Sequence, residues 1–218
     1  MPPAKITLSK KKPLVWKRRK PKVSKNVARY VKSTVTKAIS TRQEHKYWML
    51  DTMGTLMPSS GTVISLCDVP AGTDDTSRVG DSIYLGTFRI NYAITAGSTV
   101  GPSRARVIIL QWCETDSPVF TSSNVLQDAF NYPTISMLRH DALRSKQLRI
   151  MSDKTYTLDA DDPQATASLV LRPPLRKIQY DNGGPTGTNK LYMVLLSNAV
   201  LGAQPSIQFM TKLNFTDS

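Results

Sequence analysis

Cysteine and histidine are scarce in this sequence. Only two cysteines, Cys67 and Cys113, occur in 218 residues, and each follows a run of residues typical of a strand. Two cysteines are too few for a disulfide framework, so we expect two buried thiols and a reducing compartment. The two histidines, His45 and His140, have no further histidine or cysteine at the spacing of a zinc site.

Sequence signatures of catalysis are also missing. His140 and Asp141 could suggest a base and its orienting carboxylate, but no nucleophile motif accompanies them. The glycines of 183–187 lack the Lys-Ser/Thr of a phosphate-binding loop, and the acidic loop 159–162 lacks the glycine and terminal glutamate of an EF-hand. We therefore predict that the protein is not an enzyme. The alternative, an enzyme on a β sandwich, would need a clustered polar site.

Long hydrophobic runs are absent as well. The longest, such as residues 107–110, are far too short to span a bilayer. The basic N-terminus has no apolar stretch behind it, which is unlike a secretory signal. We expect no membrane insertion.

Acidic residues are missing from the first 43 positions, which hold 14 basic ones. Because the chain has 29 basic and 16 acidic residues, residues 44–218 hold 15 basic against 16 acidic, a net charge of −1. Like charges at the density of the first segment repel one another and disfavour collapse. The sequence thus predicts a basic N-terminal arm over 1–43, disordered over 1–25, and one globular domain over 44–218.

The arm is predicted to bind nucleic acid. Lysine and arginine neutralise phosphates without reading base sequence, and an aromatic ring can stack on a base. The candidate contacts are Lys10, Lys11, Lys12, Trp16, Lys17, Arg18, Arg19, Lys20, Lys22, Lys25, Arg29, Lys32 and Lys37. The run 17–22 could also serve as a nuclear localisation signal, and a solvated tail is the alternative reading of such a charge run.

The end of the arm has helical periodicity. Val27, Tyr30, Val31 and Val35 recur at the spacing of one helix face, which predicts a short amphipathic helix over about 26–40. Ser24 or Asn26 could cap its start. A helix of this length is marginal in isolation, so we expect its apolar stripe to need a partner.

After Thr41 the pattern becomes that of strands. The eight strand candidates are 46–57, 62–69, 82–95, 104–113, 147–158, 167–180, 190–199 and 205–215. A phase change at Gly86 predicts a β-bulge in the third strand, and the fourth strand is apolar on both faces, as in the centre of a sheet. Pro173-Pro174 indicates an edge or a bend in the sixth.

These elements predict an all-β fold. Eight short strands with turn signals between them are typical of an eight-stranded β jelly roll of two four-stranded antiparallel sheets. The long connection 114–146 is predicted to contain a short helix near 125–130, capped by Ser122 or Ser123.

Several segments, taken in order, resemble the satellite tobacco necrosis virus coat protein and the capsid proteins of circular Rep-encoding single-stranded DNA (CRESS-DNA) viruses. The matching pieces are Glu44-His45-Lys46, Arg78-Val79-Gly80-Asp81 before the third strand, Arg104 to Trp112, Val125-Leu126, Lys146 to Asp153, Thr155 to Leu158 and the end Phe215-Thr216-Asp217-Ser218. No single piece is specific, and the resemblance lies in their order, their spacing and their attachment to a basic arm.

The resemblance implies a viral capsid protein. It implies a T=1 icosahedral shell of about sixty copies, in which the arm helix points inward and touches a packaged single-stranded genome. The arm is longer and more basic than in the satellite virus, which favours DNA over RNA. Glu44 and Asp217 match carboxylates that bind calcium between subunits in some relatives. The expected location is the virion, with the host nucleus or cytoplasm during assembly, and import receptors as further partners.

A different class of function remains open. A cellular single-stranded nucleic-acid-binding or ribosomal-type protein could also carry a basic tail. Such a protein would place basic and aromatic residues on the folded domain too, whereas residues 44–218 have a net charge of −1.

Overall fold

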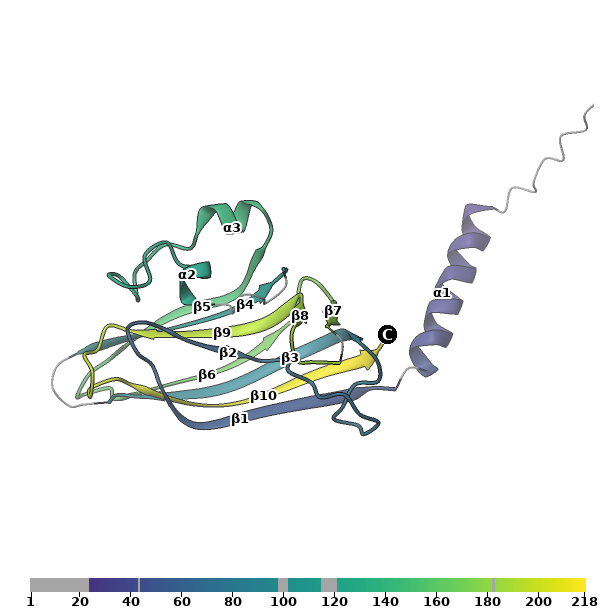
Figure 1. Cartoon of the computed structure of the whole chain (residues 1–218). Coiled ribbons are helices and arrows are strands. Elements are labelled where there is room, and N and C mark those ends of the chain that lie inside the picture. Colours follow the sequence, from purple (N-terminus) through teal and green to yellow (C-terminus); the bar gives the residue numbers. More distant parts are fainter. Residues whose placement is uncertain (1–23, 43, 98–101, 115–120, 182) are drawn as a thin grey trace, which may run out of the picture. The chain divides into compact units, whose positions relative to one another are not determined.

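The computed structural model describes residues 24–42, 44–97, 102–114, 121–181 and 183–218, and the chain divides into two units after Arg42. The first unit contains helix α1 (Lys25–Arg42), which begins one residue before the predicted helix and ends two residues beyond it. The second, called the β unit below, contains ten strands and two short helices among its described residues (Figure 1). The predicted disorder of residues 1–25 lies almost wholly outside the described residues.

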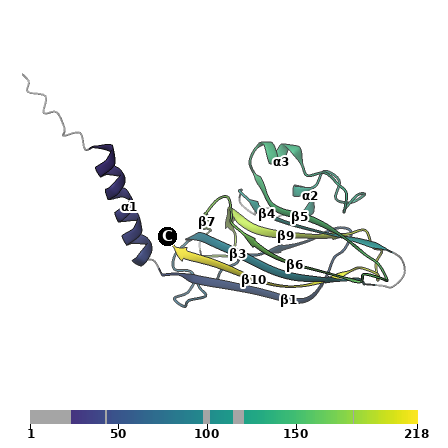
Figure 2. The same ribbon diagram turned by 180° about the vertical axis from the view of Figure 1, so that it is seen from behind.

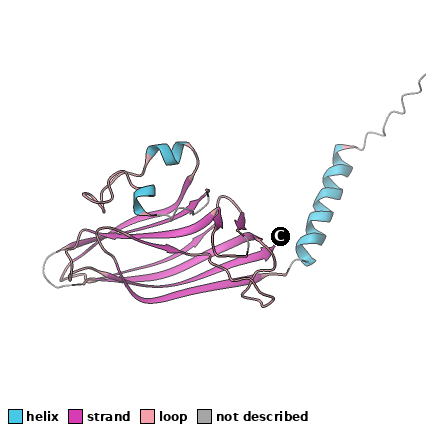
Figure 3. Ribbon diagram, in the orientation of Figure 1, coloured by secondary structure: helices cyan, strands magenta, loops and turns pink. Residues whose placement is uncertain are grey.

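The strands form two antiparallel sheets (Figure 3). Sheet A contains β1 (Lys46–Leu56), β10 (Ser206–Asp217), β3 (Ser82–Thr95), β6 (Gln164–Leu171), β7 (Lys177–Tyr180) and β8 (Gly187–Thr188). Sheet B contains β2 (Thr62–Ser65), β9 (Lys190–Ser197), β4 (Ser103–Trp112) and β5 (Leu148–Leu158).

The order of pairing is that of a jelly roll. The first strand pairs with the last, β2 with β9, β3 with β6 and β7, and β4 with β5. The chain therefore behaves as one long antiparallel ribbon that folds over on itself, so that successive pairs fall alternately in sheet A and sheet B. The predicted all-β jelly-roll-like fold is confirmed.

The predicted count of eight strands in two four-stranded sheets is wrong in detail. Sheet A has six strands because the sixth candidate divides into β6 and β7 around Pro173-Pro174, and because the two-residue strand β8 pairs with β7. Proline has no N–H to donate to a ladder, which accounts for the break.

Two apolar layers hold sheet B in place. One cluster lies between the sheets and includes Phe88, Ile109 and Met193. A second includes Ile108 and Val194 from the opposite face of sheet B, together with Val125 and Leu126 from the long connection. This is why every residue of β9, and every residue of β4 from Ala105 onward, is buried, as the sequence predicts for the fourth strand.

The bulge in β3 is confirmed at the predicted glycine. Along the β3–β10 ladder, Phe88 faces Leu213 and Leu85 faces Phe215, so two residues of β3 stand opposite Asn214 alone. The Gly86 backbone approaches β10 so closely that a Cβ there would lie 3.1 Å from the carbonyl oxygen of Asn214. The extra residue restores the inward orientation of both halves of the strand.

The long connection contains two short helices, which lie over sheet B in both views (Figures 1 and 2). The predicted helix near 125–130 is wrong in position: α2 spans Ser122–Val125 with Thr121 as N-cap. Leu126, directly after it, is extended and pairs with Leu138, and both pack toward sheet B. The second helix, α3 (His140–Arg144), was not predicted.

The two cysteines form no disulfide, as predicted. Cys67 is fully buried, and its sulfur accepts the Leu191 N–H at 3.1 Å. The prediction of a second buried thiol is wrong in degree, because Cys113, directly after β4, is only partly buried; burial raises the pKa of its thiol.

Candidate nucleic-acid interface and assembly surfaces

Helix α1 carries the described part of the predicted nucleic-acid-binding set. Lys25, Arg29 and Lys32 are exposed, and Lys37 lies in the same helix. At 3.6 residues per turn these three exposed cations fall on the side opposite Val31, so one face of the helix can meet phosphate. The other predicted contacts lie outside the described residues: Lys10, Lys11, Lys12, Trp16, Lys17, Arg18, Arg19, Lys20 and Lys22.

The start of α1 is fixed by a local cap. The Ser24 hydroxyl accepts the Val27 N–H at 3.3 Å, which satisfies one of the amides that a helix start leaves without a partner. Of the two predicted caps, Ser24 therefore makes this contact.

The apolar stripe of α1 is exposed. Val27, Val31 and Val35 have about half of their surface accessible, and Tyr30 has 72% accessible. Four large apolar side chains on one helix face contribute no burial energy until another surface covers them. The helix thus presents an exposed cationic side and an exposed apolar side.

Several basic residues of the β unit have a different role, because they are buried and paired. Lys46, Arg78, Arg106 and Lys190 are each at most 7% exposed, and each lies within 4 Å of a carboxylate. Buried cations remain charged only when such partners compensate for lost hydration. These four side chains hold the fold together and are not available to a ligand.

Lys46 joins the first strand to the last. Its Nζ lies 3.0 Å from Asp217 Oδ2 and donates to the Ser77 carbonyl oxygen at 3.2 Å, with Glu44 Oε2 at 3.8 Å. The hydrogen bond to Asp217 is the main cause that raises the pKa of Lys46, against burial, which lowers it. Asp217 also accepts the Val79 N–H through its other oxygen, at 3.0 Å.

This geometry bears on the two residues matched to calcium ligands. The structure brings Glu44 and Asp217 to the same place, but the ammonium group of Lys46 lies between their carboxylates. Among the described residues, no group of three or more His, Cys, Asp and Glu side chains could hold a metal ion. Within one copy, the pair therefore serves as the counter-charge of Lys46.

Arg78 organises the loops next to that junction. Its Nε donates to the Val69 carbonyl oxygen at 3.1 Å, and one terminal nitrogen donates to the carbonyl oxygens of Gly183 and Gly184, both at 2.9 Å. The guanidinium carbon lies 4.0 Å from the centre of the Tyr180 ring. One side chain thus connects three segments that have no regular structure of their own.

Two further ion pairs anchor sheet B. Arg106 in β4 meets Asp153 in β5 through two bonds of 2.8 and 2.7 Å, and also donates to the Ser136 carbonyl oxygen at 2.7 Å. It therefore attaches the long connection to the sheet. Lys190 Nζ lies 2.8 Å from Asp68 Oδ1.

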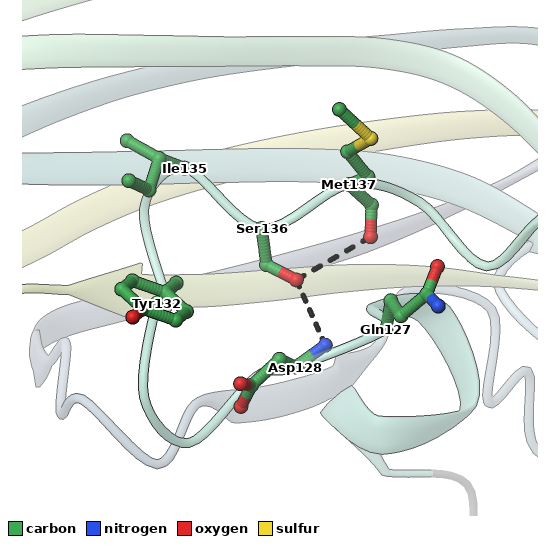
Figure 4. A pocket seen from close by; sticks show the side chains of 6 residues that line it. All are labelled: Gln127, Asp128, Tyr132, Ile135, Ser136 and Met137. Carbon is green, nitrogen blue, oxygen red and sulfur yellow. Dashed lines mark hydrogen bonds between the residues drawn. The ribbon is translucent and has the colours of Figure 1, made fainter.

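The long connection presents an exposed apolar surface. Phe130, Tyr132, Ile135 and Met137 are 58–83% accessible. Figure 4 shows part of this surface around a hollow of about 450 Å³, where the Ser136 hydroxyl accepts the Asp128 N–H at 2.9 Å. Large apolar side chains that gather on a surface are typical of protein–protein contacts.

A second apolar surface lies at the tip of the loop between β9 and β10. Val200 and Leu201 are 75% and 90% accessible, and Gly202 follows with a φ of +88°. The loop is braced by its ends, because the Met57 N–H donates to the Pro205 carbonyl oxygen at 2.9 Å. An exposed apolar loop tip suits contact with another molecule.

Among the described residues, no hydrogen bond or ion pair joins His140 to Asp141. His140 begins α3, and the carboxylate of Asp141 pairs with Arg139 at 2.7 Å. His45 is exposed at the start of the β unit. No helix in the described part of the chain is long and apolar enough to cross a membrane.

Sequence reasoning missed the buried cations. The matching segments contain Lys46, Arg78 and Arg106, but nothing in a local pattern says that a charged side chain points inward. The only available signal was the strand alternation: a lysine or arginine at a position where the alternation expects a buried side chain.

The chain matches known proteins in structure but not in sequence. No protein-family model matches the chain, and no curated protein matches it. Among solved structures, a chain of Desmodium yellow mottle tymovirus is similar, with a TM-score of 0.39 and 6% identity over 79% of this chain and 86% of that chain.

Proposed function

We propose that the chain is a viral capsid protein that assembles into a small T=1 icosahedral shell and packages a single-stranded genome through its basic arm. The observation that carries this proposal is the separation of charge from fold. Fourteen basic residues and no acidic one precede a jelly-roll unit whose own net charge is −1. A neutral building block with a cationic tail suits a shell whose wall associates with itself and whose lining binds nucleic acid.

The total positive charge of the arms agrees with packaging of a small genome. If about sixty arms each bring fourteen cations, the interior gains roughly 840 positive charges, on the scale of the phosphates of a small genome. Contacts of this kind are independent of base sequence and weaken steeply with salt.

Exposed apolar surfaces support assembly. The α1 stripe, the 130–137 surface and the Val200–Leu201 tip are available for contacts between copies. In the proposed shell, α1 turns its cations toward the genome and its stripe toward neighbouring helices. Single-stranded DNA is the proposed cargo, with the virion as location and the run 17–22 as an import signal in a host nucleus.

Negative-stain electron microscopy of the purified protein, with absorbance at 260 and 280 nm on the same chromatographic peak, tests the proposal. Uniform spheres with a nucleic-acid spectrum are the expected result. Small monomers or dimers that bind oligonucleotides but never form spheres would overturn it in favour of a cellular single-strand-binding protein. Nuclease digestion of the extracted cargo decides between DNA and RNA.

Deletion of residues 1–25 tests the arm separately. We expect a folded protein whose particles, if formed, lack nucleic acid. A matched control replaces the basic residues of 10–22 with glutamine, which keeps the length and removes the charge. Normal packaging by both variants would contradict the role of the arm.

A further inference from the structure

The outer face of sheet A has a cationic half. Arg89 in β3 and Lys212 in β10 stand directly opposite each other in the ladder, and both are exposed. Directly opposed side chains have Cβ atoms about 5 Å apart, so two like charges there disfavour the folded state unless an anion lies between or above them. No acidic residue shares this row of the face, whose other members are Met49 and Val170.

Aromatic rings accompany these cations. Lys212 Nζ lies 4.8 Å from the centre of the Tyr47 ring, which is itself partly exposed, and Tyr47 faces Asn214 in the next row toward the start of β1. One row further on, the exposed Tyr84 stands opposite Lys177. Three successive rows of the face therefore mix cations with tyrosines.

The same half of the face is hollowed. A cavity of about 460 Å³ is lined by His45, Tyr84, Arg176 and Asn214, among others. Arg176 is exposed and adds a further cation to this half of the face. Among the strand residues of this face, the nearest acidic one is Asp51, opposite Met210 in the row next to Lys212. Asp75 lies at the β1 edge, where its carbonyl oxygen accepts the Tyr47 N–H at 3.1 Å.

No described helix of the β unit covers this face, since α2 and α3 both lie over sheet B (Figures 1 and 2). An open sheet that bears tyrosines between lysine and arginine is a surface on which single-stranded nucleic acid binds, with bases on the rings and phosphates on the cations. The net charge of −1 for residues 44–218 conceals the surface, because the compensating acidic residues lie elsewhere.

We infer that this half of sheet A, the Tyr47–Lys212–Arg89 face, is a second binding surface for single-stranded nucleic acid, distinct from the arm. The inference rests on the proposed function for its source of ligand, the packaged strand. Charge complementarity selects the occupant: a second copy of this chain would have to offer an acidic surface, whereas a phosphodiester strand offers one negative charge per nucleotide. The arm supplies most of the charge, and the face orders the nucleotides that lie against it.

The test compares two charge-reversed variants of the full chain. The first is Arg89→Glu with Lys212→Glu. The matched control is Arg144→Glu with Lys154→Glu, which makes the same charge change at exposed positions in α3 and in β5 of sheet B. Binding of a fluorescent oligothymidylate is measured over a range of salt concentrations, and ultraviolet cross-links to the same oligonucleotide are mapped by mass spectrometry.

We expect the face variant to bind with a salt dependence whose log–log slope is smaller by about 1.4, the value for two lost phosphate contacts on a single strand. The slope of the control variant should be closer to that of the unmodified chain than the slope of the face variant is. Cross-links should map to Tyr47 or Tyr84 as well as to the arm, and should disappear from the tyrosines in the face variant.

The other outcomes separate the two ideas. Cross-links confined to the arm, with equal slopes for both variants, would overturn the inference and leave the proposed function intact. Particles of the face variant that form poorly but carry normal nucleic acid would identify the face as a contact between copies, which also overturns it. A chain that binds no oligonucleotide at all would overturn both.

Discussion

The Nζ of Lys46, at the start of β1, lies 3.0 Å from Oδ2 of Asp217, at the end of β10. The lysine side chain is 1% exposed, so a buried ion pair joins β1 to β10 at the point where the arm meets the β unit. Replacing Asp217 with Asn would leave the ammonium group buried beside a neutral amide. We expect a loss of about 2 kcal/mol of unfolding free energy, the range of a hydrogen bond to a charged group.

Urea denaturation of the Asp217→Asn variant measures this loss. Glu44→Gln is the control, because that carboxylate lies 3.8 Å from Lys46 with 64% of its side chain exposed, and an exposed pair contributes at most about 0.5 kcal/mol. Equal losses of unfolding free energy in the two variants would show that the buried pair with Asp217 stabilises the β unit no more than the exposed pair with Glu44.

Arg78→Lys should destabilise the β unit by about 2–4 kcal/mol. A lysine cannot reach Val69 and the pair Gly183 and Gly184 at once, and it loses the flat stacking over Tyr180. Thermal or urea unfolding gives the difference. Arg89→Lys, the same change at an exposed position, should stay within about 0.5 kcal/mol, and a similar cost at both sites would refute the organising role of Arg78.

Stability should fall as the pH rises above about 10. Burial, followed by the hydrogen bond with Tyr156, raises the pKa of Tyr92 from its ordinary value of 10.0, and burial likewise raises the pKa of Tyr180. Above that pH the unfolded chain releases these protons while the folded chain keeps them, so folding is favoured less. The raised pKa of Lys46 acts in the same direction above 10.5.

Tyr180→Phe isolates one part of this effect. Each such group contributes up to about 1.4 kcal/mol per pH unit above its pKa in the unfolded chain. The variant should therefore lose stability less steeply between about pH 9 and pH 11 than the unmodified chain, as measured by urea midpoints. An unchanged slope for Tyr180→Phe would contradict the expectation.

Val31→Asp with Val35→Asp should lower the yield of assembled particles several-fold without changing the urea midpoint of the β unit. Both side chains are about half exposed on the α1 stripe, so the new charges enter no packed core. They would be buried only where another molecule covers the stripe. The control, Val31→Leu with Val35→Leu, changes the same two side chains but keeps the stripe apolar. Particle yield by sedimentation decides: a normal yield for the stripe variant would exclude packing through this face.

Local pattern predicted most of the strands. Alternation placed β1, β3 and β10 within a few residues of their observed ends, and the phase change at Gly86 located the bulge because burial on one face fixes side-chain period. The proline pair at 173–174 indicated the break between β6 and β7. Strand β8, only two residues long, has no detectable period and was missed.

The side-chain contacts could not be predicted in the same way. Whether Lys46 or Arg78 points inward depends on partners such as Asp217 and Gly183, which are distant in the sequence. The Lys212–Arg89 pair depends on the register between the last strand and the third, which local sequence does not give. The net charge of the β unit does not reveal such a cluster, because it sums over all faces.

The place of β10 between β1 and β3 has a consequence for the order of synthesis. A ribosome makes the basic arm and β1 first, yet sheet A cannot close until residues 206–217 have emerged and inserted between strands made much earlier. Sheet A therefore forms only after its other strands have been made, and slowly, as expected for contacts of high sequence separation. A chain cut short before β10 cannot complete sheet A, because β10 is the strand that joins β1 to β3.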